Sequence, residues 1–445
     1  YEITDHWFQV PLTHGLIFSK GKDAALSSRF ADQTITVFAR EVVSTNETLT
    51  VSADKRPYIV YLQGGPGFGS PKTGSIGGWI AELAKTHRVV LLDQRGTGMS
   101  SPLSARNITA VGDAQVQAEY TELFRADSII ADAEAVREVL LADRADKRWS
   151  TIGQSFGGFL TLSYLSFAPQ SLRDCRITAG LAPIRTSVDN VYQHTFDRMK
   201  ERNEEYYSWF PEDAELATRI AEHLRTHKEY LPTGERLTDH RFQMAGHFLG
   251  GRWRERGLHY FLETAFAEGN DHLSDQFLTA MGAEVTFQAN PLYALMHETI
   301  YADGPADGVL PGIPGYELSP SPAPTNWSAA RVAASRPEFA PDADRLLFTG
   351  EHIFPWYYEE DPSLRPLAEV ANLLAEKKDW GRLYDHAQLH KNEVPVVAAA
   401  YNPDVYVDFE HSMETARWVG NTHVWTSKTH QIGRASCRER VSSPV

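Results

Sequence analysis

The first 180 residues alternate between short apolar runs and segments with a helical period. Residues 34–43 begin with alternating apolar positions, as expected of a strand. A helix is expected at 128–145, where Ile129, Val136 and Leu140 share one face. The remaining apolar runs are short and continuous, which is typical of strands buried on both faces. The pattern therefore predicts strands at 34–43, 57–62, 88–92, 149–152 and 176–181.

The pattern changes between Arg185 and Ala340. Strand signals fade, and helical, aromatic-rich stretches take over, which predicts an inserted helical cap. Residues 305–324 are rich in proline and glycine and are expected to form a loop. Further strands are expected at 345–350, 394–401 and 423–426, with helices at 366–377 and 412–419. We therefore divide the chain into a first core part (1–184), a cap (185–340), a second core part (341–432) and a C-terminal tail (433–445).

Alternating strands and helices predict an α/β fold with a mostly parallel sheet and helices on both faces. Ligands of such sheets bind beyond the carboxyl ends of the strands. Three glycine-rich stretches, 63–69, 93–98 and 153–158, follow predicted strands and should meet at that edge. In the second stretch, Arg95 is expected to brace the loop together with Asp93 rather than to act in catalysis. Three converging loops indicate a functional site more strongly than any one of them.

The composition is that of a globular protein with a sizeable core, because the 445 residues are 42% hydrophobic and 23% charged. No apolar run approaches the ~20 residues of a membrane-spanning helix. The formal net charge of −15 disfavours nucleic acid and anionic membranes as partners and is compatible with a cationic substrate. Cys175 and Cys437 alone support neither a disulfide framework nor a zinc site, and this scarcity favours a cytoplasmic location.

The two ends of the chain differ from the rest. The start, Tyr1–Asp5, lacks the basic and apolar regions of a signal peptide. Residues 433–441 have neither a helical nor a strand period, and they resemble translated adapter DNA more than a protein terminus. We therefore expect the tail to be foreign, with a natural disordered tail as the alternative.

The stretch Gly153–Gly158 reads Gly-Gln-Ser-Phe-Gly-Gly between a predicted strand and an apolar, helix-compatible segment. The pattern G-x-S-x-G in that setting predicts a nucleophile elbow, which lifts a serine hydroxyl above the sheet edge. Ser155 is the predicted nucleophile, and the N–H of Phe156 would point at the group that it attacks. The backbone of Gly64 and Gly65 is expected to supply a second oxyanion donor. Taken alone, the motif is equally compatible with an ordinary glycine-rich turn.

A serine nucleophile needs a base, and the base needs a third group to orient it. In α/β-hydrolases the order along the chain is serine, acid, histidine. Asp404 follows the predicted strand 394–401 and is the expected acid, with a turn aspartate after Pro403 as the alternative reading. Asp408 is the rival carboxylate, but it lies further from the end of the strand.

Three motifs together resemble the proline iminopeptidases, which are α/β-hydrolases that remove an N-terminal proline from peptides. They are Leu-Gln-Gly-Gly-Pro-Gly at 62–67, Leu-Asp-Gln-Arg-Gly-Thr-Gly at 92–98 and Gly-Gln-Ser-Phe-Gly-Gly at 153–158. Gln63 departs from many members, which have histidine there, although the larger members often have glutamine. The resemblance extends from about Asp5 to Thr429, and the larger members are also similar at 258–260, 292–298, 349–351 and 405–408.

This resemblance implies a serine aminopeptidase that works through an acyl-enzyme intermediate, with Ser155 as nucleophile and Asp404 as acid. It also implies that carboxylates of the cap hold the free α-ammonium of the substrate, because a buried cation needs a paired anion. Glu298 is the first candidate, and Glu263 and Glu351 follow. A solvated helix face or a structural ion pair is the alternative role for each. Aromatic side chains of the cap are expected to form the proline pocket.

The catalytic base has two candidate positions. His430 follows the last predicted strand, 423–426, in the expected order. By the family pattern, the histidine would stand at position 432, where this chain has Ile432 within the suspected foreign tail. Either His430 is the base or the natural base has been lost, and the family pattern favours the second. His390 precedes Asp404 and so breaks the expected order.

An esterase or amidase of the same fold is the alternative function, because a fold does not determine its substrate. A non-enzymatic binder would be expected to lose the nucleophile or the oxyanion glycines. Haloalkane dehalogenases and most epoxide hydrolases have aspartate at the elbow, so Ser155 argues against them. No metal or organic cofactor is implied. The expected partner is a peptide or small amide with a free N-terminus.

Overall fold

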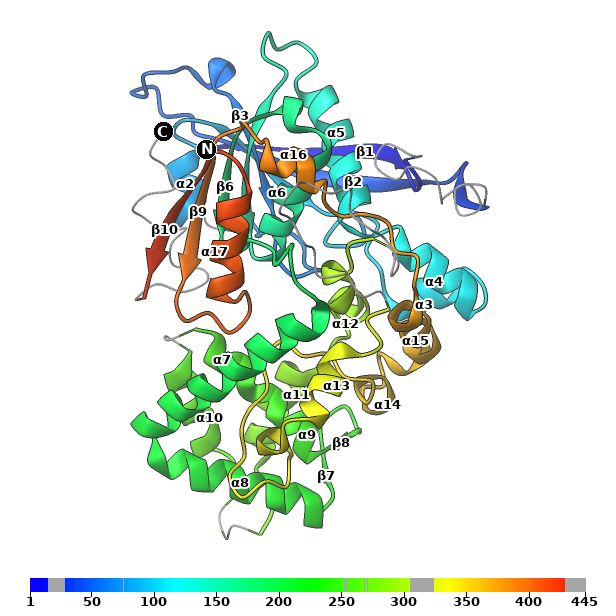
Figure 1. Ribbon diagram of the computed structural model, residues 1–445, viewed down its shortest axis with the longest axis vertical. Helices are drawn as coiled ribbons and strands as arrows, with labels where there is room; N and C mark the ends of the chain where they lie inside the picture. The colour runs from blue at the N-terminus through cyan, green and yellow to red at the C-terminus, as the bar shows by residue number, and fades with distance from the viewer. Residues whose placement is uncertain are drawn as a thin grey trace.

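The central element is an eight-stranded sheet in the order β1-β2-β4-β3-β5-β6-β9-β10 (Figure 1). The computed structural model describes residues 1–14, 29–74, 76–251, 254–267, 269, 271–304 and 324–428. β2 pairs antiparallel with β1 and β4, and the other neighbouring strands are parallel, which confirms the predicted class. The strands are β1 (Glu2–Pro11), β2 (Thr34–Val43), β3 (Tyr58–Leu62), β4 (Arg88–Asp93), β5 (Trp149–Gln154), β6 (Leu172–Thr178), β9 (Val396–Tyr401) and β10 (Thr422–Ser427).

Helices cover both faces of this sheet. Successive side chains of a strand point to opposite sides, so a buried strand has apolar residues to cover on each face. Val60 and Leu62 of β3 belong to the same apolar cluster as α5 and α6, whereas Ile59 and Tyr61 pack with α2. The helices of this part are α2 (Gly78–Leu83), α3 (Ala105–Thr109), α4 (Ala114–Glu122), α5 (Ala126–Leu140), α6 (Phe156–Phe167), α15 (Ala368–Glu376), α16 (His386–His390) and α17 (Phe409–Trp418). The short helix α14 (Tyr357–Glu360) lies with the cap instead, where Thr238 and His240 bond to Glu360.

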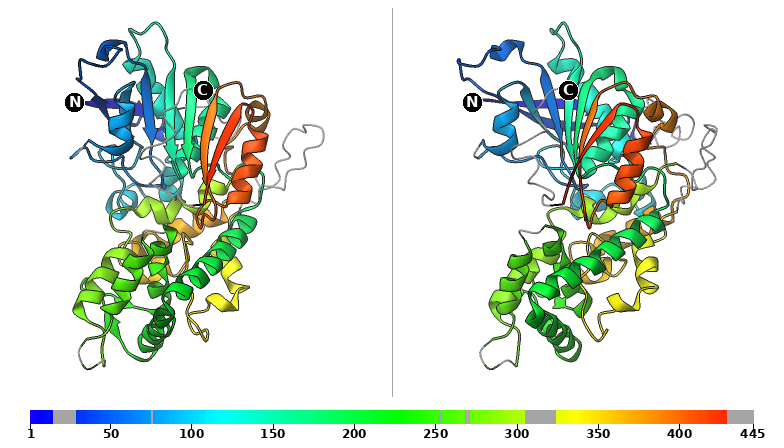
Figure 2. Two further views of the ribbon diagram at one scale, coloured as in Figure 1. Left: turned by 90° about the vertical axis from the view of Figure 1, so that its left-hand side faces the viewer. Right: turned by 60° about the vertical axis from the view of Figure 1, so that its left-hand side comes forward.

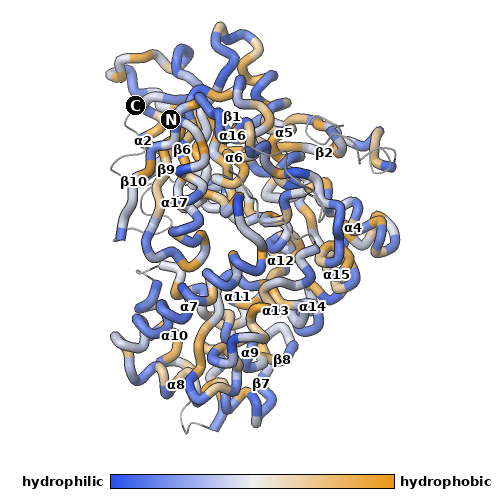
Figure 3. The backbone as a smooth tube through the Cα atoms, in the orientation of Figure 1, coloured by the Kyte–Doolittle hydropathy of each residue, from blue (hydrophilic) through white to orange (hydrophobic). Residues whose placement is uncertain are grey.

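Helices α7–α13, which we call the cap helices, lie beyond the carboxyl ends of the parallel strands (Figures 1 and 2). The arrowheads of β9 and β10 point toward α7 in Figure 1. Figure 3 shows α7 as mostly hydrophilic, in keeping with a helix that has one face in solvent. The cap helices are α7 (Val188–Trp209), α8 (Pro211–Thr226), α9 (Asp239–Gln243), α10 (Glu255–Glu263), α11 (Asp275–Val285), α12 (Pro291–Met296) and α13 (Ser328–Ala334), with a short hairpin of β7 (Glu229–Tyr230) and β8 (Arg236–Leu237).

Helices are therefore found where the sequence predicts a helical insertion. The domain boundaries after residues 184 and 340 stay predictions. The expected loop at 305–324 lies outside the described residues except for Pro324, and the tail at 433–445 lies outside them entirely. Among the described residues, no helix is both long and apolar enough to cross a membrane.

The predicted sheet strand at 345–350 is wrong. This segment runs beside α7 in the cap, where Asn203 accepts a hydrogen bond from the Phe348 backbone N–H (2.8 Å) and donates one to the Phe348 carbonyl (2.9 Å). The Tyr207 hydroxyl donates to the carbonyl of Leu346 (2.8 Å). Because side chains of α7 satisfy its backbone, the apolar run fills the interior of the cap instead of joining the sheet. The sheet resumes only at β9.

Two other strands differ from the expectation. β6 begins and ends several residues before the predicted 176–181, and the φ of 47° at Ala179 takes the chain out of the extended conformation. β1 is an edge strand that no pattern predicted, because most of its residues are polar or exposed. It pairs with β2 along its full length, so backbone hydrogen bonds define it more than burial does.

Candidate active site

Ser155 stands at the sharp turn between β5 and α6, at the carboxyl end of a central strand. Its φ of 52° and ψ of −122° are rarely adopted by a residue other than glycine and occur mainly at functional sites. The turn is held by two backbone hydrogen bonds, from Ser155 N–H to the Thr178 carbonyl (2.9 Å) and from Gly158 N–H to the Ser155 carbonyl (2.7 Å). This strained strand-turn-helix geometry is what a nucleophile elbow requires.

The glycines that follow the serine let α6 pass close to the sheet. A Cβ atom on Gly157 would overlap the backbone carbonyl of Leu62 at the end of β3. One on Gly158 would overlap the carbonyl of Gly180, after β6. The elbow is therefore wedged between the ends of its two neighbouring strands, and its position leaves no room for side chains there.

The Gly-Gly-Pro-Gly loop lies directly beside Ser155. A Cβ atom on Gly64 would stand 3.1 Å from the Cβ of Ser155 and 2.9 Å from the carbonyl oxygen of Gln154. Gly65, next in the loop, has a φ of 136°, which favours glycine. Phe156 begins α6, and the first N–H groups of a helix have no acceptor within it. The structure thus brings Gly64 and Phe156 next to Ser155, with Gly65 beside Gly64.

Polar side chains after β4 hold this loop in place. Gln94 donates from Nε2 to the carbonyl of Gln63 (2.8 Å). Asp93 accepts backbone hydrogen bonds from residues on both sides of it in the chain. Arg95 also braces the structure, but its acidic partner is Asp132 on α5 (Nε to Oδ2, 2.7 Å), not Asp93. The glycine-rich stretch 93–98 therefore supports the site without contributing to its chemistry.

Asp404 lies just beyond β9, in a buried turn. Its Oδ1 accepts hydrogen bonds from the backbone N–H groups of Tyr406 (2.9 Å) and Val407 (3.1 Å). Burial raises the pKa of this carboxyl to about 7 against the effect of these bonds, and the nearby charge of Glu351 adds to the rise. Both backbone hydrogen bonds go to Oδ1, so neither of them occupies Oδ2. Asp408, the rival acid, instead caps the start of α17.

Of the histidine candidates for the base, the structure describes only His390. His430 and Ile432 lie outside the described residues. The last strand before them, β10, ends at Ser427, whose carbonyl accepts a hydrogen bond from Asn402 N–H (2.9 Å), two residues before the expected acid. His390 is exposed on α16, with its ring stacked on Trp418 at 4.3 Å.

Glu351 is the carboxylate that shares the electrostatic environment of Asp404. Its Oε2 lies 3.8 Å from Nε2 of His297, and its side chain is 27% exposed. Burial alone would raise the pKa of Glu351, but hydrogen bonds and charge from His297, with help from His247 and Tyr293, hold it below its usual range. Glu351 therefore ionises at a lower pH than Asp404, whose carboxyl is still about half protonated near pH 7.

Glu298 and Glu263 have different surroundings. Glu298 is 6% exposed, and its two oxygens accept backbone hydrogen bonds from Ser328 (3.2 Å) and Ala329 (2.9 Å) at the start of α13. Burial raises the pKa of Glu298 in spite of these bonds. Glu263 is exposed on α10 and lies 3.3 Å from His259, one turn earlier. Of the three predicted amine-binding residues, Glu298 and Glu351 lie near the candidate site.

Tyr301 joins these carboxylates to the elbow, and the sequence analysis did not single it out. Burial raises its pKa, and the charges of Glu351, Asp404 and Glu298 raise it further, so all three carboxylates lie around it. Its ring contacts Phe159 of α6, with 5.9 Å between centroids. Further ring contacts connect this group to the helix of the elbow and to the cap, through Phe156, Tyr192, His297 and Tyr293. In the sequence, only its place three residues after Glu298 and the expectation of aromatic cap residues could have indicated it.

The fold and the elbow define an α/β-hydrolase, and a family model described as the alpha/beta hydrolase fold matches residues 57–227. A proline iminopeptidase of Aeromonas sobria is 40% identical over 427 residues, which cover 96% of this chain and 91% of that protein. Proline iminopeptidase aneH of Aspergillus aculeatus is 36% identical over 428 residues, 94% of this chain and 87% of that protein. The chain therefore belongs to the proline iminopeptidase family.

One matching solved structure is more distant in sequence. A thermophilic esterase from Thermogutta terrifontis is 10% identical and covers 95% of this chain and 89% of its own, with a TM-score of 0.37. That score is too low to carry an argument about function.

Proposed function

We propose that this chain is a serine aminopeptidase that releases an N-terminal proline from peptides. The observation that carries this proposal is the strained Ser155 beside the Gly-Gly-Pro-Gly loop, in a chain that is 40% identical over 96% of its length to a proline iminopeptidase. The alternative, an esterase or amidase of the same fold, would use the same nucleophile on a different substrate.

In the proposed reaction, the Ser155 hydroxyl oxygen attacks the carbonyl carbon of the N-terminal residue while a histidine base takes the hydroxyl proton. The carbonyl oxygen becomes negative and is stabilised by the Phe156 N–H and the backbone of Gly64 and Gly65. The protonated base then gives its proton to the leaving amine, and the C–N bond breaks. Water, activated by the same base, hydrolyses the acyl-enzyme and restores Ser155. Asp404 orients the base throughout.

We propose Glu351 as the principal anion for the α-ammonium of the substrate. An exopeptidase must place this cation close to the nucleophile, so its partner should be ionised and accessible. Glu351 meets both conditions, since its pKa is lowered and its side chain is partly exposed. Glu298 is less available, because both of its oxygens already accept backbone hydrogen bonds. Glu263 is the weakest candidate, because it is exposed and pairs with His259 in the cap.

The proline pocket is proposed to lie around Tyr301. A pyrrolidine ring bound beside Ser155 would meet the aromatic rings that extend from α6 into the cap, namely Phe156, Phe159, Tyr301 and Tyr192. Such rings offer an apolar surface with few polar atoms to satisfy. Glu351, beside Tyr301, would hold the ring nitrogen, which in an N-terminal proline is also the charged amine.

The test compares three substrates on the parent chain and, because the family pattern places the base at position 432, on its Ile432→His variant: prolyl-β-naphthylamide, N-acetylprolyl-β-naphthylamide and a p-nitrophenyl ester. We expect release from the first and none from the second, because acetylation removes the ammonium charge. Ser155→Ala should lower turnover by at least about 10³-fold without changing the thermal midpoint, with the exposed Ser208→Ala as matched control. Ester turnover without prolyl release would reject the aminopeptidase assignment in favour of the alternative.

The base is tested by two variants of the same chain. If His430 is the base, His430→Ala should abolish the activity of the parent. If the base belongs at position 432, Ile432→His should raise prolyl release by several orders of magnitude and His430→Ala should have little effect. A chain in which neither variant changes the rate would contradict both assignments.

We also propose a cytoplasmic location and the division into two core parts and a cap. The first is supported by the buried free thiol of Cys175, whose pKa burial raises to about 12, as expected of an unreactive thiol in a reducing compartment. The second is supported by the way the cap helices gather beyond the strand ends (Figure 2). Fractionation of the natural host and limited proteolysis would test the two statements.

A further inference from the structure

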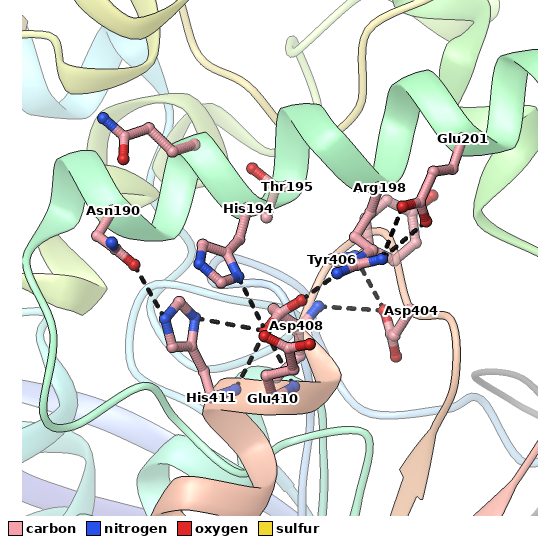
Figure 4. Close-up of polar contacts among 12 residues, drawn as sticks. Asn190, His194, Thr195, Arg198, Glu201, Asp404, Tyr406, Asp408, Glu410 and His411 are labelled. Atoms are coloured by element: carbon pink, nitrogen blue, oxygen red, sulfur yellow. Dashed lines mark hydrogen bonds and ion pairs between the residues drawn. The ribbon is translucent and has the colours of Figure 1, made fainter.

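Three potential metal ligands meet where the cap helix α7 faces the start of α17 (Figure 4). His194 comes from α7, Asp408 is the residue just before α17, and His411 lies in the first turn of that helix. Their ligand atoms all lie within 4.8 Å of one another. Nδ1 of His194 is 3.3 Å from Oδ1 of Asp408, and Nδ1 of His411 is 3.7 Å from the same oxygen. None of these residues takes part in the proposed peptidase chemistry.

His411 has a buried nitrogen that lacks a hydrogen-bond partner. The residue is 8% exposed, and its Nδ1 makes no hydrogen bond within the described part of the chain. Its other nitrogen, Nε2, lies 3.1 Å from Oδ1 of Asn190. An amide oxygen only accepts, so in the neutral ring Nε2 carries the proton and Nδ1 presents its lone pair toward Asp408. A carbonyl-type partner on the far nitrogen is also how histidine ligands of metals are usually oriented.

The spacing of the three atoms fits a small divalent ion. Metal–nitrogen and metal–oxygen distances near 2.0–2.1 Å in a tetrahedral site place neighbouring ligand atoms about 3.3–3.4 Å apart. The separations of 3.3 and 3.7 Å at Asp408 are close to that value. The carboxylate is already oriented, because Oδ1 accepts the backbone N–H groups of Glu410 (3.0 Å) and His411 (3.1 Å).

We propose that His194, Asp408 and His411 form a binding site for one divalent transition-metal ion of the Zn²⁺ type. Ions of this type prefer sites that contain imidazole nitrogens to sites built from oxygen alone, and two imidazoles with one carboxylate meet that preference. A cavity of about 400 Å³, lined in part by His194, His411 and Glu410, opens beside the cluster and would supply a water as the fourth ligand. The site is structural, since it holds no group that the proposed reaction uses.

Nearby charges both oppose and support the ion. Arg198 lies 3.3 Å from Oδ2 of Asp408, so the guanidinium contacts that oxygen, whereas Oδ1, which also accepts the two backbone hydrogen bonds, faces the two imidazoles. Arg185 and Arg417 also line the cavity, but so do Glu410 and Glu414. The two glutamates on the cavity wall offset the two arginines there, and the metal would add its charge where Oδ1 of Asp408 faces it.

A bound ion would connect the cap to the loop of the proposed catalytic acid. His194 belongs to the cap, and Asp408 is four residues after Asp404 in the same loop (Figure 4). Tyr406 lies between the two aspartates. Its backbone N–H donates a hydrogen bond to Asp404, and its hydroxyl donates one to the carbonyl of His247 in the cap (3.2 Å). The metal would therefore fix the position of α7 against the turn that holds Asp404.

The experiment uses the full chain without a polyhistidine tag, freed of metal by a chelator and then titrated with ZnCl₂. We expect one equivalent to bind and the thermal midpoint to rise with Zn²⁺ concentration, because the ion binds only the folded form. Substitution with Co²⁺ should give the visible d–d absorption of a four-coordinate nitrogen and oxygen site. Neither readout depends on peptidase activity.

Variants decide which residues bind the ion. His194→Ala and His411→Ala should each weaken Zn²⁺ binding by at least tenfold, and Asn190→Ala by about 10–100-fold through the loss of the orienting partner. The exposed His272→Ala is the matched control and should bind as the parent does. His194 is 28% exposed, so its variant should fold even if that of His411 does not. No Zn²⁺ uptake by the parent, or equal uptake by His194→Ala and His272→Ala, would overturn the proposal.

Discussion

At the scale of single residues, the candidate site holds two carboxylates whose pKa values are shifted in opposite directions. Burial raises the pKa of Asp404 to about 7, and the histidines and tyrosine around Glu351 lower its pKa although burial opposes them. Such a separation assigns different tasks to chemically similar groups. We assign orientation of the base to Asp404 and binding of the substrate cation to Glu351.

The raised pKa of Asp404 makes stability depend on pH. Its pKa lies above the ordinary value of 3.8, so the folded chain holds this proton more tightly than the unfolded chain. The resulting stabilisation is fully present below about pH 4 and is lost as the pH rises through about 7. We expect Asp404→Asn, which is uncharged at every pH, to match the parent at pH 4 and to exceed it at pH 8 by at most about 4 kcal/mol. Urea denaturation at both pH values measures this, and an equal difference at both would contradict it.

Glu351 and Glu298 should respond differently to the same substitution. Glu351→Gln removes the proposed anion, so KM for prolyl-β-naphthylamide should rise by at least about tenfold while the unfolding free energy changes little. Glu298→Gln places an amide N–H₂ against a backbone N–H donor at the start of α13, which should lower the unfolding free energy by about 1–3 kcal/mol. Steady-state kinetics and urea denaturation of both variants test the assignment. The opposite pattern would make Glu298 the substrate anion.

At the scale of elements, the elbow depends on how closely α6 approaches β3. A Cβ atom on Gly157 would overlap the carbonyl of Leu62, so we expect Gly157→Ala to lower the unfolding free energy by about 1–3 kcal/mol. Gly282 is the matched control, because it lies in α11 and an added Cβ would meet its nearest neighbours only at 3.8 Å. Gly282→Ala should be neutral or stabilising by about 0.5–1 kcal/mol. Equal effects of the two substitutions would show that the approach of α6 to β3 is not tight.

Some strands of the sheet can be predicted from a hydrophobic pattern, and others cannot. The strands β3, β4 and β9 follow from continuous apolar runs, and the run at 345–350 looks the same in the sequence. Periodicity does not distinguish a sheet strand from another buried extended segment. What separates them is a partner distant in the sequence, since Asn203 on α7 pairs with the backbone of Phe348. β1 was missed for the converse reason, because backbone pairing at an edge leaves little trace in hydrophobicity.

At the scale of the whole molecule, the core of the site was predictable because it is local. Ser155, Phe156 and Gly64 lie in motifs whose glycines record the close approach of backbones, and the structure brings them together. The substrate side of the site was less predictable. Glu351 and Tyr301 come from segments that meet only when the cap covers the strand ends, so no spacing in the sequence relates them to Asp404.

The core is also joined to the cap by a buried arginine. Arg125, at the start of α5, is 6% exposed and donates from NH2 to the carbonyls of Thr299 (2.8 Å) and Ala302 (2.5 Å), on either side of Tyr301. Its guanidinium also lies over the ring of Trp380, 4.3 Å from the centroid. One core residue therefore holds the segment that carries the proposed proline pocket.

We expect Arg125→Ala to lower the unfolding free energy by about 3 kcal/mol, because it leaves buried carbonyls without donors. KM for prolyl-β-naphthylamide should rise as well, since Tyr301 would lose its support. Arg125→Lys should recover only part of both losses, because an ammonium on a flexible stem does not reproduce the planar fork of the guanidinium. The exposed Arg106→Ala is the control for the loss of a positive charge. If Arg125→Ala unfolds at the same urea concentration as Arg106→Ala and keeps the parent KM, the core does not position the pocket through this residue.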